Sequence, residues 1–489
     1  MAETNNTRQA AWIALGSFFS TCFGIISSMI LSRYFNIEEY GLYKQVLFVY
    51  SSILAISTLG LPKAFSYFLP KSPIDKAKSL INKLTYAFIV LGGIMSLILF
   101  LGAQQIANLL NAPNLVTPLR IFSPVPFMML PTMGLEGVLS TYRCTKFMAL
   151  YNFTTRLVML LCVALPVMVW NVSCNMALVG FNIGSAFAFV LALYLKYYPV
   201  RHAGSETTNV TYRNIFNFCM PLFVATLWGT LINSTSQYFI SRFFGTETFA
   251  IFSNGAMELP FVGMIIASSS SVLTPLFTRM VHEKKDLSVT MLPTWRSVFA
   301  KSAMIIYPMT VFCIAMAEPI MTLMYGEQYA ASALFFRYSL LTYFVKVIIF
   351  YSIIIALGAT RFYQYLHAVH AIGLIITDLL IVILCHNPYL IALNMSLWAI
   401  FNVVCMELYI SRKTGISMIK LIPVSTLIRV IAACALGLIV MFGIDMLLTD
   451  VLPLYRLGIC AIIFLLSVFA VSIPLRLRYL DILKPLYSR

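Results

Sequence analysis

The chain has 489 residues, of which 60% are hydrophobic and only 10% are charged. Soluble domains carry about 25% charged residues, and a soluble protein could not keep so much apolar surface away from water. The composition therefore excludes a soluble globular protein. The formal net charge of +16 would suit nucleic acid, but the basic residues lie between apolar segments, so anionic lipid headgroups are the expected partner and nucleic acid is not.

Apolar segments of about 20 residues, the length that crosses a bilayer, follow one another along the whole chain. The first is too long for a signal-peptide core, and no small-residue cleavage pattern closes it. The intervening loops are too short for a soluble domain. We therefore expect an all-α polytopic membrane protein of about fourteen spans, at about residues 10–32, 45–68, 84–109, 118–141, 147–170, 175–196, 214–240, 249–275, 298–323, 332–358, 362–385, 388–411, 424–447 and 454–475.

Three prolines, Pro124, Pro126 and Pro131, lie close together within the fourth expected span. Proline removes a backbone donor and breaks a helix. In a membrane such breaks are tolerated where neighbouring groups or a cavity satisfy the freed backbone. A hinge is therefore expected at residues 118–141.

The distribution of lysine and arginine predicts the orientation, because inner loops are richer in both. With the N-terminus inside, 25 of the 33 fall on the inner side, six on the outer side and two within spans. The outer six are Arg33, Lys44, Arg120, Arg242, Arg337 and Arg456, and the two within spans are Arg156 and Lys346. This bias predicts that both termini lie in the cytoplasm, and the membrane expected is the inner (cytoplasmic) one.

The sequence also repeats itself. Residues 32–43, SRYFNIEEYGLY, match residues 241–252, SRFFGTETFAIF, without a gap, and each segment follows an outward-going span. The identical positions include Arg33 and Glu38 in the first copy and Arg242 and Glu247 in the second. The motif itself is interpreted as architectural: the arginine reaches headgroups and the glutamate caps or pairs.

The offset of six spans between the two copies predicts a parallel repeat of two six-helix bundles, as in many transporters. The expected organisation is an N-terminal bundle at 1–198, a cytoplasmic linker at 199–213, a second bundle at 214–412, and two additional helices with a short tail at 413–489.

The segments LSRYFNIEEYGLYKQV and LGLPKAFSYFLPK, within residues 10–70, resemble the polysaccharide transporters. These belong to the multidrug/oligosaccharidyl-lipid/polysaccharide (MOP) exporter superfamily, which includes the Wzx-type O-antigen flippases. The resemblance implies two six-helix bundles around a central cavity that opens alternately to each side. The last two spans would line a groove for a lipid tail, as in the related lipid II flippases.

The resemblance also implies the substrate: an undecaprenyl-diphosphate-linked oligosaccharide, a repeat unit of O-antigen, capsule or exopolysaccharide, moved from the inner to the outer leaflet. No cofactor is implied, and a proton or sodium gradient or the membrane potential would drive transport. Membrane lipids and a glycan polymerase machinery are the further partners expected.

A diphosphate crosses lipid only with compensating charge, because bare charge in hydrocarbon is costly. Arg156 lies about ten residues from the inner edge of its span, or roughly 15 Å deep, and arginine grips phosphate with two hydrogen bonds. The alternative is an ion pair with Glu136. Lys346 is equally deep in the tenth span, where it would face the cavity or pair with Asp378.

Arg143 and Lys146 lie at the inner mouth and are the other candidate substrate-binding residues, although the inner-loop charge bias alone would account for them. Glu258 and Asp378 are the candidate ion-coupling residues, because carboxylates within spans titrate readily unless they are paired. Glu258 precedes Pro260, which frees a carbonyl that suits an ion.

No catalytic residues and no metal site are expected, and the chain is predicted not to be an enzyme. It has no phosphate loop, metalloprotease motif or nucleophile elbow, and its ten cysteines are scattered as small buried hydrophobes without a CxxC pair. Three alternatives stay open: a multidrug/cation antiporter of the same superfamily, a membrane glycan polymerase or ligase, and a scaffolding membrane protein.

Overall fold

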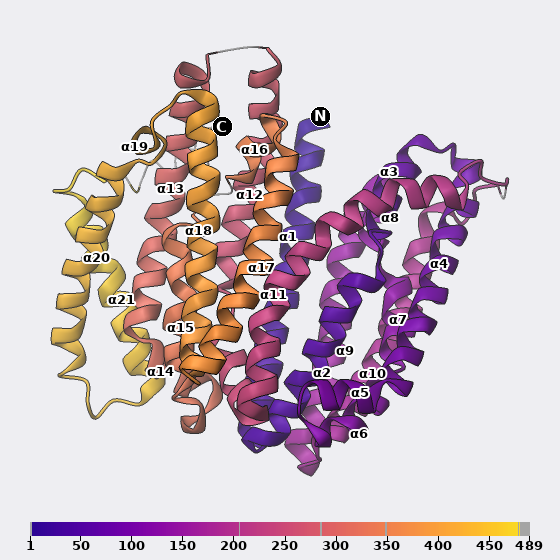
Figure 1. Ribbon diagram of the computed structural model, residues 1–489, viewed down its shortest axis with the longest axis horizontal. Helices are drawn as coiled ribbons and strands as arrows, with labels where there is room; N and C mark the ends of the chain where they lie inside the picture. Colours follow the sequence, from indigo (N-terminus) through magenta and orange to yellow (C-terminus); the bar gives the residue numbers. More distant parts are fainter. Residues whose placement is uncertain (1, 205, 284–285, 348–349, 478, 480–489) are drawn as a thin grey trace. The chain divides into compact units, whose positions relative to one another are not determined.

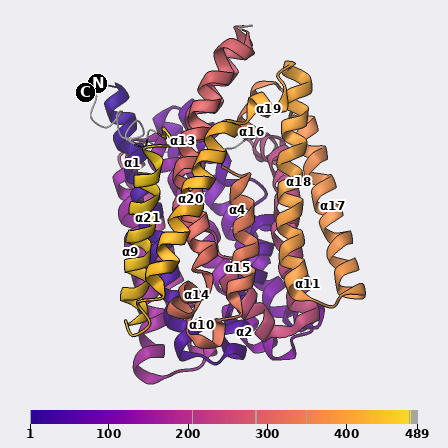
Figure 2. The ribbon, with the colours of Figure 1, turned by 90° about the vertical axis from the view of Figure 1, so that its left-hand side faces the viewer.

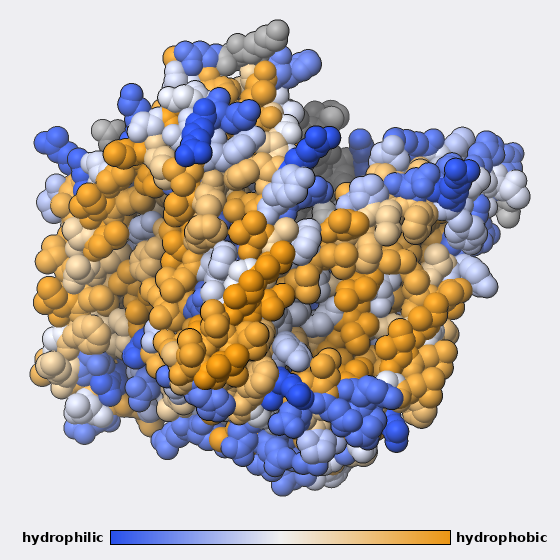
Figure 3. Space-filling view, viewed as in Figure 1, coloured by the Kyte–Doolittle hydropathy of each residue, from blue (hydrophilic) through white to orange (hydrophobic). Residues whose placement is uncertain are grey.

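The computed structural model describes residues 2–204, 206–283, 286–347, 350–477 and 479, and the regular structure in these ranges is helical throughout. It divides into two compact units, Met1–Ile251 (unit 1) and Phe252–Arg489 (unit 2). In each unit a band of hydrophobic side chains lies between hydrophilic ends (Figure 3). Five of the basic residues counted on the inner side lie outside the described residues: Lys284, Lys285, Arg478, Lys484 and Arg489.

Within the described ranges, eleven helices are long and apolar enough to cross a membrane, or twelve if a helix pair bent by 40° within residues 212–255 is one span. This confirms an all-α, multi-pass membrane protein. Continuous helices do not reach the expected fourteen, because the expected spans at 118–141 and 332–358 are each divided into short helices. These two are the fourth members of the two expected six-span bundles.

Unit 1 is drawn from indigo to magenta in Figure 1, and α9 packs against both α1 and α10. Its helices are α1 (Ala2–Tyr34), α2 (Ile37–Ser57), α3 (Pro62–Phe68), α4 (Ile74–Leu101), α5 (Ala103–Leu109), α6 (Val116–Phe122), α7 (Val125–Met129), α8 (Leu135–Thr141), α9 (Thr145–Trp170), α10 (Cys174–Tyr197) and most of α11 (Tyr212–Gly255).

Unit 2 contains two antiparallel helix pairs, α17 with α18 and α20 with α21, which Figure 2 shows in orange and yellow. Its helices are α12 (Pro260–His282), α13 (Leu287–Ala315), α14 (Ala317–Tyr325), α15 (Ser332–Leu340), α16 (Tyr351–Ala356), α17 (Thr360–Leu384), α18 (Pro388–Thr414), α19 (Met418–Leu421), α20 (Val424–Asp445) and α21 (Pro453–Ser472).

The two copies of the repeated segment have the same helix break. Asn36 caps α2, its side-chain oxygen accepting a hydrogen bond from the Glu39 N–H, so the chain passes from one helix to the next at this residue. The equivalent residue in the second copy, 209 positions later, is Gly245, which interrupts α11 with a φ of 84°. Glycine adopts this left-handed conformation without steric cost. The sequence match therefore extends to local structure.

The break at 332–358 has no proline. After α15 the chain forms a short 3-10 turn, Leu341–Phe344, before α16 begins at Tyr351. The Tyr307 hydroxyl of α13 donates a hydrogen bond of 2.7 Å to the Phe344 carbonyl. A side chain of a neighbouring helix thus satisfies a carbonyl at the break, as a membrane interior requires.

Candidate functional site

The broken segment at 118–141 is held by side chains of the helices beside it. The Asn182 amide of α10 donates a 2.7 Å hydrogen bond to the Ile121 carbonyl, and the Ser96 hydroxyl of α4 accepts one of 3.1 Å from the Phe127 N–H. Both partners satisfy backbone groups of the broken segment from a neighbouring helix, as a membrane interior requires. The hinge expected from the prolines is therefore an ordered break whose backbone groups have defined partners.

Lys196, near the end of α10, is the strongest of these anchors. Its side chain is fully buried and donates to the carbonyls of Pro131 and Met133, the latter at 3.1 Å. The ammonium also lies 4.9 Å from the centre of the Phe65 ring, a cation–π contact. A buried charge is tolerated only when its hydrogen bonds are made. The sequence placed Lys196 among the inner-loop cations. In the structure its ammonium lies inside unit 1, where it binds two carbonyls of the broken segment.

Gly134 begins the last helix of the broken segment, α8. Its φ is 81°, and a Cβ atom built there would lie 2.2 Å from a carbon of the Phe65 ring. A residue other than glycine would meet both a strained backbone and a steric overlap. The turn after Met133 therefore depends on this glycine.

A cavity of about 340 Å³ adjoins the break. The broken segment contributes Thr132, Met133 and Glu136 to its wall, and α9 contributes Tyr151 and Arg156. Asn152, Thr155 and Met159 of α9, Ala188 of α10 and Pro62 of α3 complete much of the rest. Hydroxyl, amide and charged groups thus meet in a cavity that belongs entirely to unit 1.

Arg156 is exposed at this cavity, and it acts electrostatically on Tyr43, Tyr50 and Tyr151. Glu136, the alternative partner expected from the sequence, lines the same cavity. Within the described residues no hydrogen bond or ion pair joins their side chains, or joins Arg156 to another group. The guanidinium therefore keeps its donors available to a ligand.

The other two cations predicted in this half lie elsewhere. Arg143 is in the turn between α8 and α9, where its φ is 55°. Lys146, in the first turn of α9, lies 5.2 Å from the centre of the Phe147 ring and lines a separate groove. The structure therefore brings Arg156 to the cavity, whereas Arg143 and Lys146 lie at the start of α9, the helix that carries Arg156.

In unit 2, Lys346 follows the short turn of the second broken segment, and Glu258 precedes α12. The two side chains are close enough to interact electrostatically, and Lys346 also acts on His367 and His370 of α17. Two residues predicted separately, one for substrate and one for an ion, thus lie within electrostatic range of each other. The two histidines were not predicted, because no motif in the sequence relates them to Lys346.

Asp378 is fully buried on α17, and it accepts a 2.8 Å hydrogen bond from the amide of Asn394 on α18. The same amide donates to the hydroxyl of Thr377 at 2.7 Å, and the Trp398 indole N–H donates to that hydroxyl at 2.9 Å. Asp378 therefore belongs to a polar cluster between two helices, and its sequence neighbours alone gave no sign of the partners on α18.

The residues of the repeat motif lie at helix ends. Glu38 accepts a 3.0 Å hydrogen bond from the Asn114 amide, and Arg242 donates to the Asn108 carbonyl. Arg33 is exposed in the last turn of α1, and Glu247 is exposed after the break at Gly245. These positions are those that an architectural motif would occupy.

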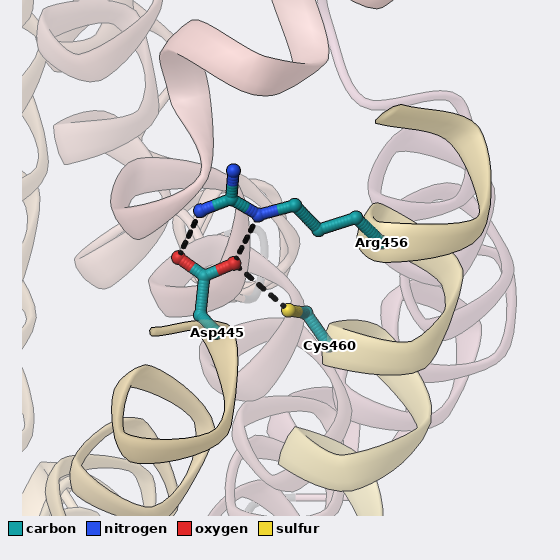
Figure 4. A network of polar contacts seen from close by, with 3 residues as sticks. All are labelled: Asp445, Arg456 and Cys460. Atoms are coloured by element: carbon teal, nitrogen blue, oxygen red, sulfur yellow. Dashed lines mark hydrogen bonds and ion pairs between the residues drawn. The ribbon is translucent and has the colours of Figure 1, made fainter. Parts of the chain in front are cut away.

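One further polar cluster joins the ends of α20 and α21 (Figure 4). Arg456 donates two hydrogen bonds to Asp445, of 2.6 and 2.9 Å, and the Cys460 thiol donates one of 3.4 Å to the same carboxylate. The sequence gave Arg456 only as an outer-side cation. Its bidentate pairing joins the end of α20 to the first turn of α21.

Comparison with known proteins identifies the family. The family model described as polysaccharide biosynthesis protein matches residues 30–334. No curated protein sequence matches the chain. Among solved structures, the lipid II flippase MurJ in an inward closed conformation superposes with a TM-score of 0.70 and 15% identity, covering 95% of this chain and 98% of that chain.

Two MATE transporters also have this fold. An inward-facing multidrug resistance MATE transporter of the MOP superfamily has a TM-score of 0.63 and 12% identity, over 81% of this chain and 94% of that chain. A mutant of the Vibrio cholerae MATE transporter VcmN has a TM-score of 0.59 and 12% identity, over 85% of this chain and 97% of that chain. At such identities the structures establish the fold, whereas the family model covers more than half of the chain. The chain therefore belongs to the family of polysaccharide biosynthesis proteins and has the fold of the MOP-superfamily transporters.

Proposed function

We propose that this protein is a flippase, which moves an undecaprenyl-diphosphate-linked oligosaccharide from the inner to the outer leaflet by alternating access. The observation that carries the proposal is Arg156, whose guanidinium is free of protein partners among the described residues and faces a cavity with polar walls. A diphosphate needs such a cation, because moving it bare through hydrocarbon is too costly. The glycan would be a repeat unit of O-antigen, capsule or exopolysaccharide.

Two further findings support this function. The family is one of polysaccharide biosynthesis proteins, and the fold is also that of a lipid II flippase. The broken segments at 118–141 and 332–358 occupy the same place in the two expected bundles, and in transporters interrupted helices in corresponding positions mark the substrate site. Lys346 in the second break is the counterpart cation that we assign to the substrate path.

The remaining assignments belong to the same proposal. Arg143 and Lys146 would receive the diphosphate at the inner mouth, and Glu258 and Asp378 would couple transport to a proton or sodium gradient. We place the protein in the inner membrane with both termini in the cytoplasm, and we expect no bond of the glycan to be made or broken. A glycan polymerase machinery would take the product, and α20 and α21 would line a groove for the lipid tail.

The test is a leaflet assay in vesicles that contain the purified protein and a labelled undecaprenyl-diphosphate oligosaccharide. An enzyme confined to the outside reports how much lipid has crossed. Wild type is compared with Arg156→Gln, and Arg120→Gln is the matched control because Arg120 is an exposed cation of the same unit outside the cavity wall. Flipping by wild type and the control but not by Arg156→Gln is expected. Equal flipping by all three would remove Arg156 from the site.

The alternative is a multidrug or cation antiporter, which the likeness to two MATE transporters favours. Such a carrier would have an acid-dominated cavity, and Glu136 is the acid available here. The same vesicles distinguish the two functions. Export of cationic dyes without movement of any lipid-linked oligosaccharide would replace the flippase proposal with this one.

A further inference from the structure

A second groove, of about 440 Å³, runs between α1 and the first part of α9. Its walls are apolar and largely aromatic, with Trp12, Leu15 and Phe19 on α1 and Leu150 and Phe153 on α9. Leu15 and Leu150 are 43% and 56% exposed, so the groove is open to its surroundings. The one charged residue in its wall is Lys146, at the start of α9.

Aromatic rings form the floor of this groove. The Phe19 and Phe23 rings of α1 pack edge-on against Phe153 of α9, with centroids 5.3 and 5.5 Å apart. Such pairs are stable beyond their buried area, so α1 and α9 hold a fixed separation here. The groove is therefore a formed feature of the fold, with a volume of about 440 Å³ between apolar walls.

The groove and the Arg156 cavity share one helix, α9, and the walls of the two are centred on different faces of it. At about 100° per residue, Lys146, Leu150 and Phe153 fall on one face of α9. Tyr151 and Thr155, which line the cavity, fall on the opposite face. A lipid in the groove would thus have its headgroup beside Lys146, at the start of α9.

We infer that this groove seats the first isoprene units of a polyprenyl diphosphate, with the diphosphate beside Lys146. The inference rests on the proposed function and adds to it a place for the part of the tail next to the diphosphate, apart from the groove that α20 and α21 would line. Only the sugar and the diphosphate need the polar cavity, whereas the tail loses nothing by remaining in an apolar channel in contact with the bilayer. A single cation at one end of an apolar groove matches a lipid whose charge is confined to one end.

The test is photo-crosslinking in vesicles with radiolabelled undecaprenyl diphosphate. The photoreactive residue benzoylphenylalanine replaces Leu150 in the groove, or Leu161 as the matched control. Leu161 is on the same helix and 47% exposed, but lies outside the groove. Labelling at position 150 well above position 161 is expected, with competition by unlabelled undecaprenyl diphosphate and not by an equal excess of phosphatidylglycerol.

Lys146→Gln is expected to reduce the labelling at position 150 about fivefold, the effect of losing one exposed charge pair. Filling the groove with Leu150→Trp should lower binding of the same lipid, and Leu161→Trp should not. Equal labelling at both positions, or equal competition by phosphatidylglycerol, would show an ordinary bilayer-facing groove and overturn the inference. Because crosslinking does not require transport, flipping without labelling at position 150 would refute the groove alone, and labelling without flipping would refute the proposed function alone.

Discussion

Replacing Gly134 with alanine tests the structure of the break directly. The φ of 81° costs an L-residue about 1–2 kcal/mol. The new Cβ would lie 2.2 Å from the Phe65 ring, and relieving such overpacking costs about 1–3 kcal/mol. Together the two effects predict a loss of about 2–5 kcal/mol in the free energy of unfolding. Flipping should fall as well, because Gly134 and its neighbours line the Arg156 cavity.

Thiol reactivity provides the assay. All ten cysteines are free, and several are buried, including Cys174 and Cys219 of unit 1. A dye that fluoresces on reaction with thiols therefore reports unfolding in detergent. Gly93→Ala is the matched control, since its nearest neighbour would be the Phe127 ring at 4.0 Å. Alanine in that helix interior should leave stability unchanged or raise it by about 1 kcal/mol.

A double-mutant cycle separates the two causes. Phe65→Leu replaces the ring that the new Cβ would strike with a smaller side chain. The loss in the free energy of unfolding of the Gly134→Ala/Phe65→Leu protein should therefore be about 1–3 kcal/mol smaller than the sum of the two single losses. The backbone cost should remain, because it does not involve Phe65. A Gly134→Ala protein within about 0.5 kcal/mol of wild type, or strictly additive losses, would refute the described turn.

Three other substitutions have expected outcomes in the same thiol-reactivity assay. Lys196→Met should lower the free energy of unfolding by about 2 kcal/mol or more, because two buried carbonyls lose a charged donor. Lys196→Arg keeps a charged donor and should lower it by less. Equal losses for the two variants would argue against the hydrogen bonds. Gln45→Leu should lower the free energy of unfolding by about 1–3 kcal/mol, because the buried Gln45 amide on α2 donates a hydrogen bond of 2.8 Å to the Ser241 hydroxyl on α11. Asp445→Asn should cost no more than about 1 kcal/mol, because its ion pair with Arg456 is partly exposed; a larger loss would show that the hairpin depends on it.

Much of the fold could be predicted from composition and segment length. In lipid, a chain must satisfy its backbone within each segment, so apolar runs of about 20 residues become helices with little ambiguity. The break at 118–141 was also visible, since Pro124, Pro126 and Pro131 are local signals. The break at 332–358 was not, because it is stabilised by a hydroxyl from Tyr307, a residue of another helix.

The site was predicted only where a residue was unusual for its surroundings. Arg156 was identified because a cation within an apolar span is costly, and the structure shows it at a cavity; its role with substrate stays a prediction. Lys196 was missed because a lysine at the end of a span is also what the inner-loop bias produces. Its partners, at Pro131 and Met133, are more than 60 positions away in the sequence. Such pairings depend on tertiary packing, which local patterns do not contain.

The broken segment at 118–141 accounts for the polar wall of the Arg156 cavity. A helix interrupted at membrane depth exposes carbonyl and N–H groups, which hydrocarbon cannot satisfy, so side chains such as Asn182 and Lys196 must supply partners. A wall built in this way is already polar, and an arginine facing it avoids much of the cost that it would have against lipid. Arg156 can therefore remain without a protein partner, which a buried cation in an unbroken bundle could not do. The prolines that interrupt the fourth segment are thus the sequence feature that lets Arg156 face a polar cavity without a protein partner.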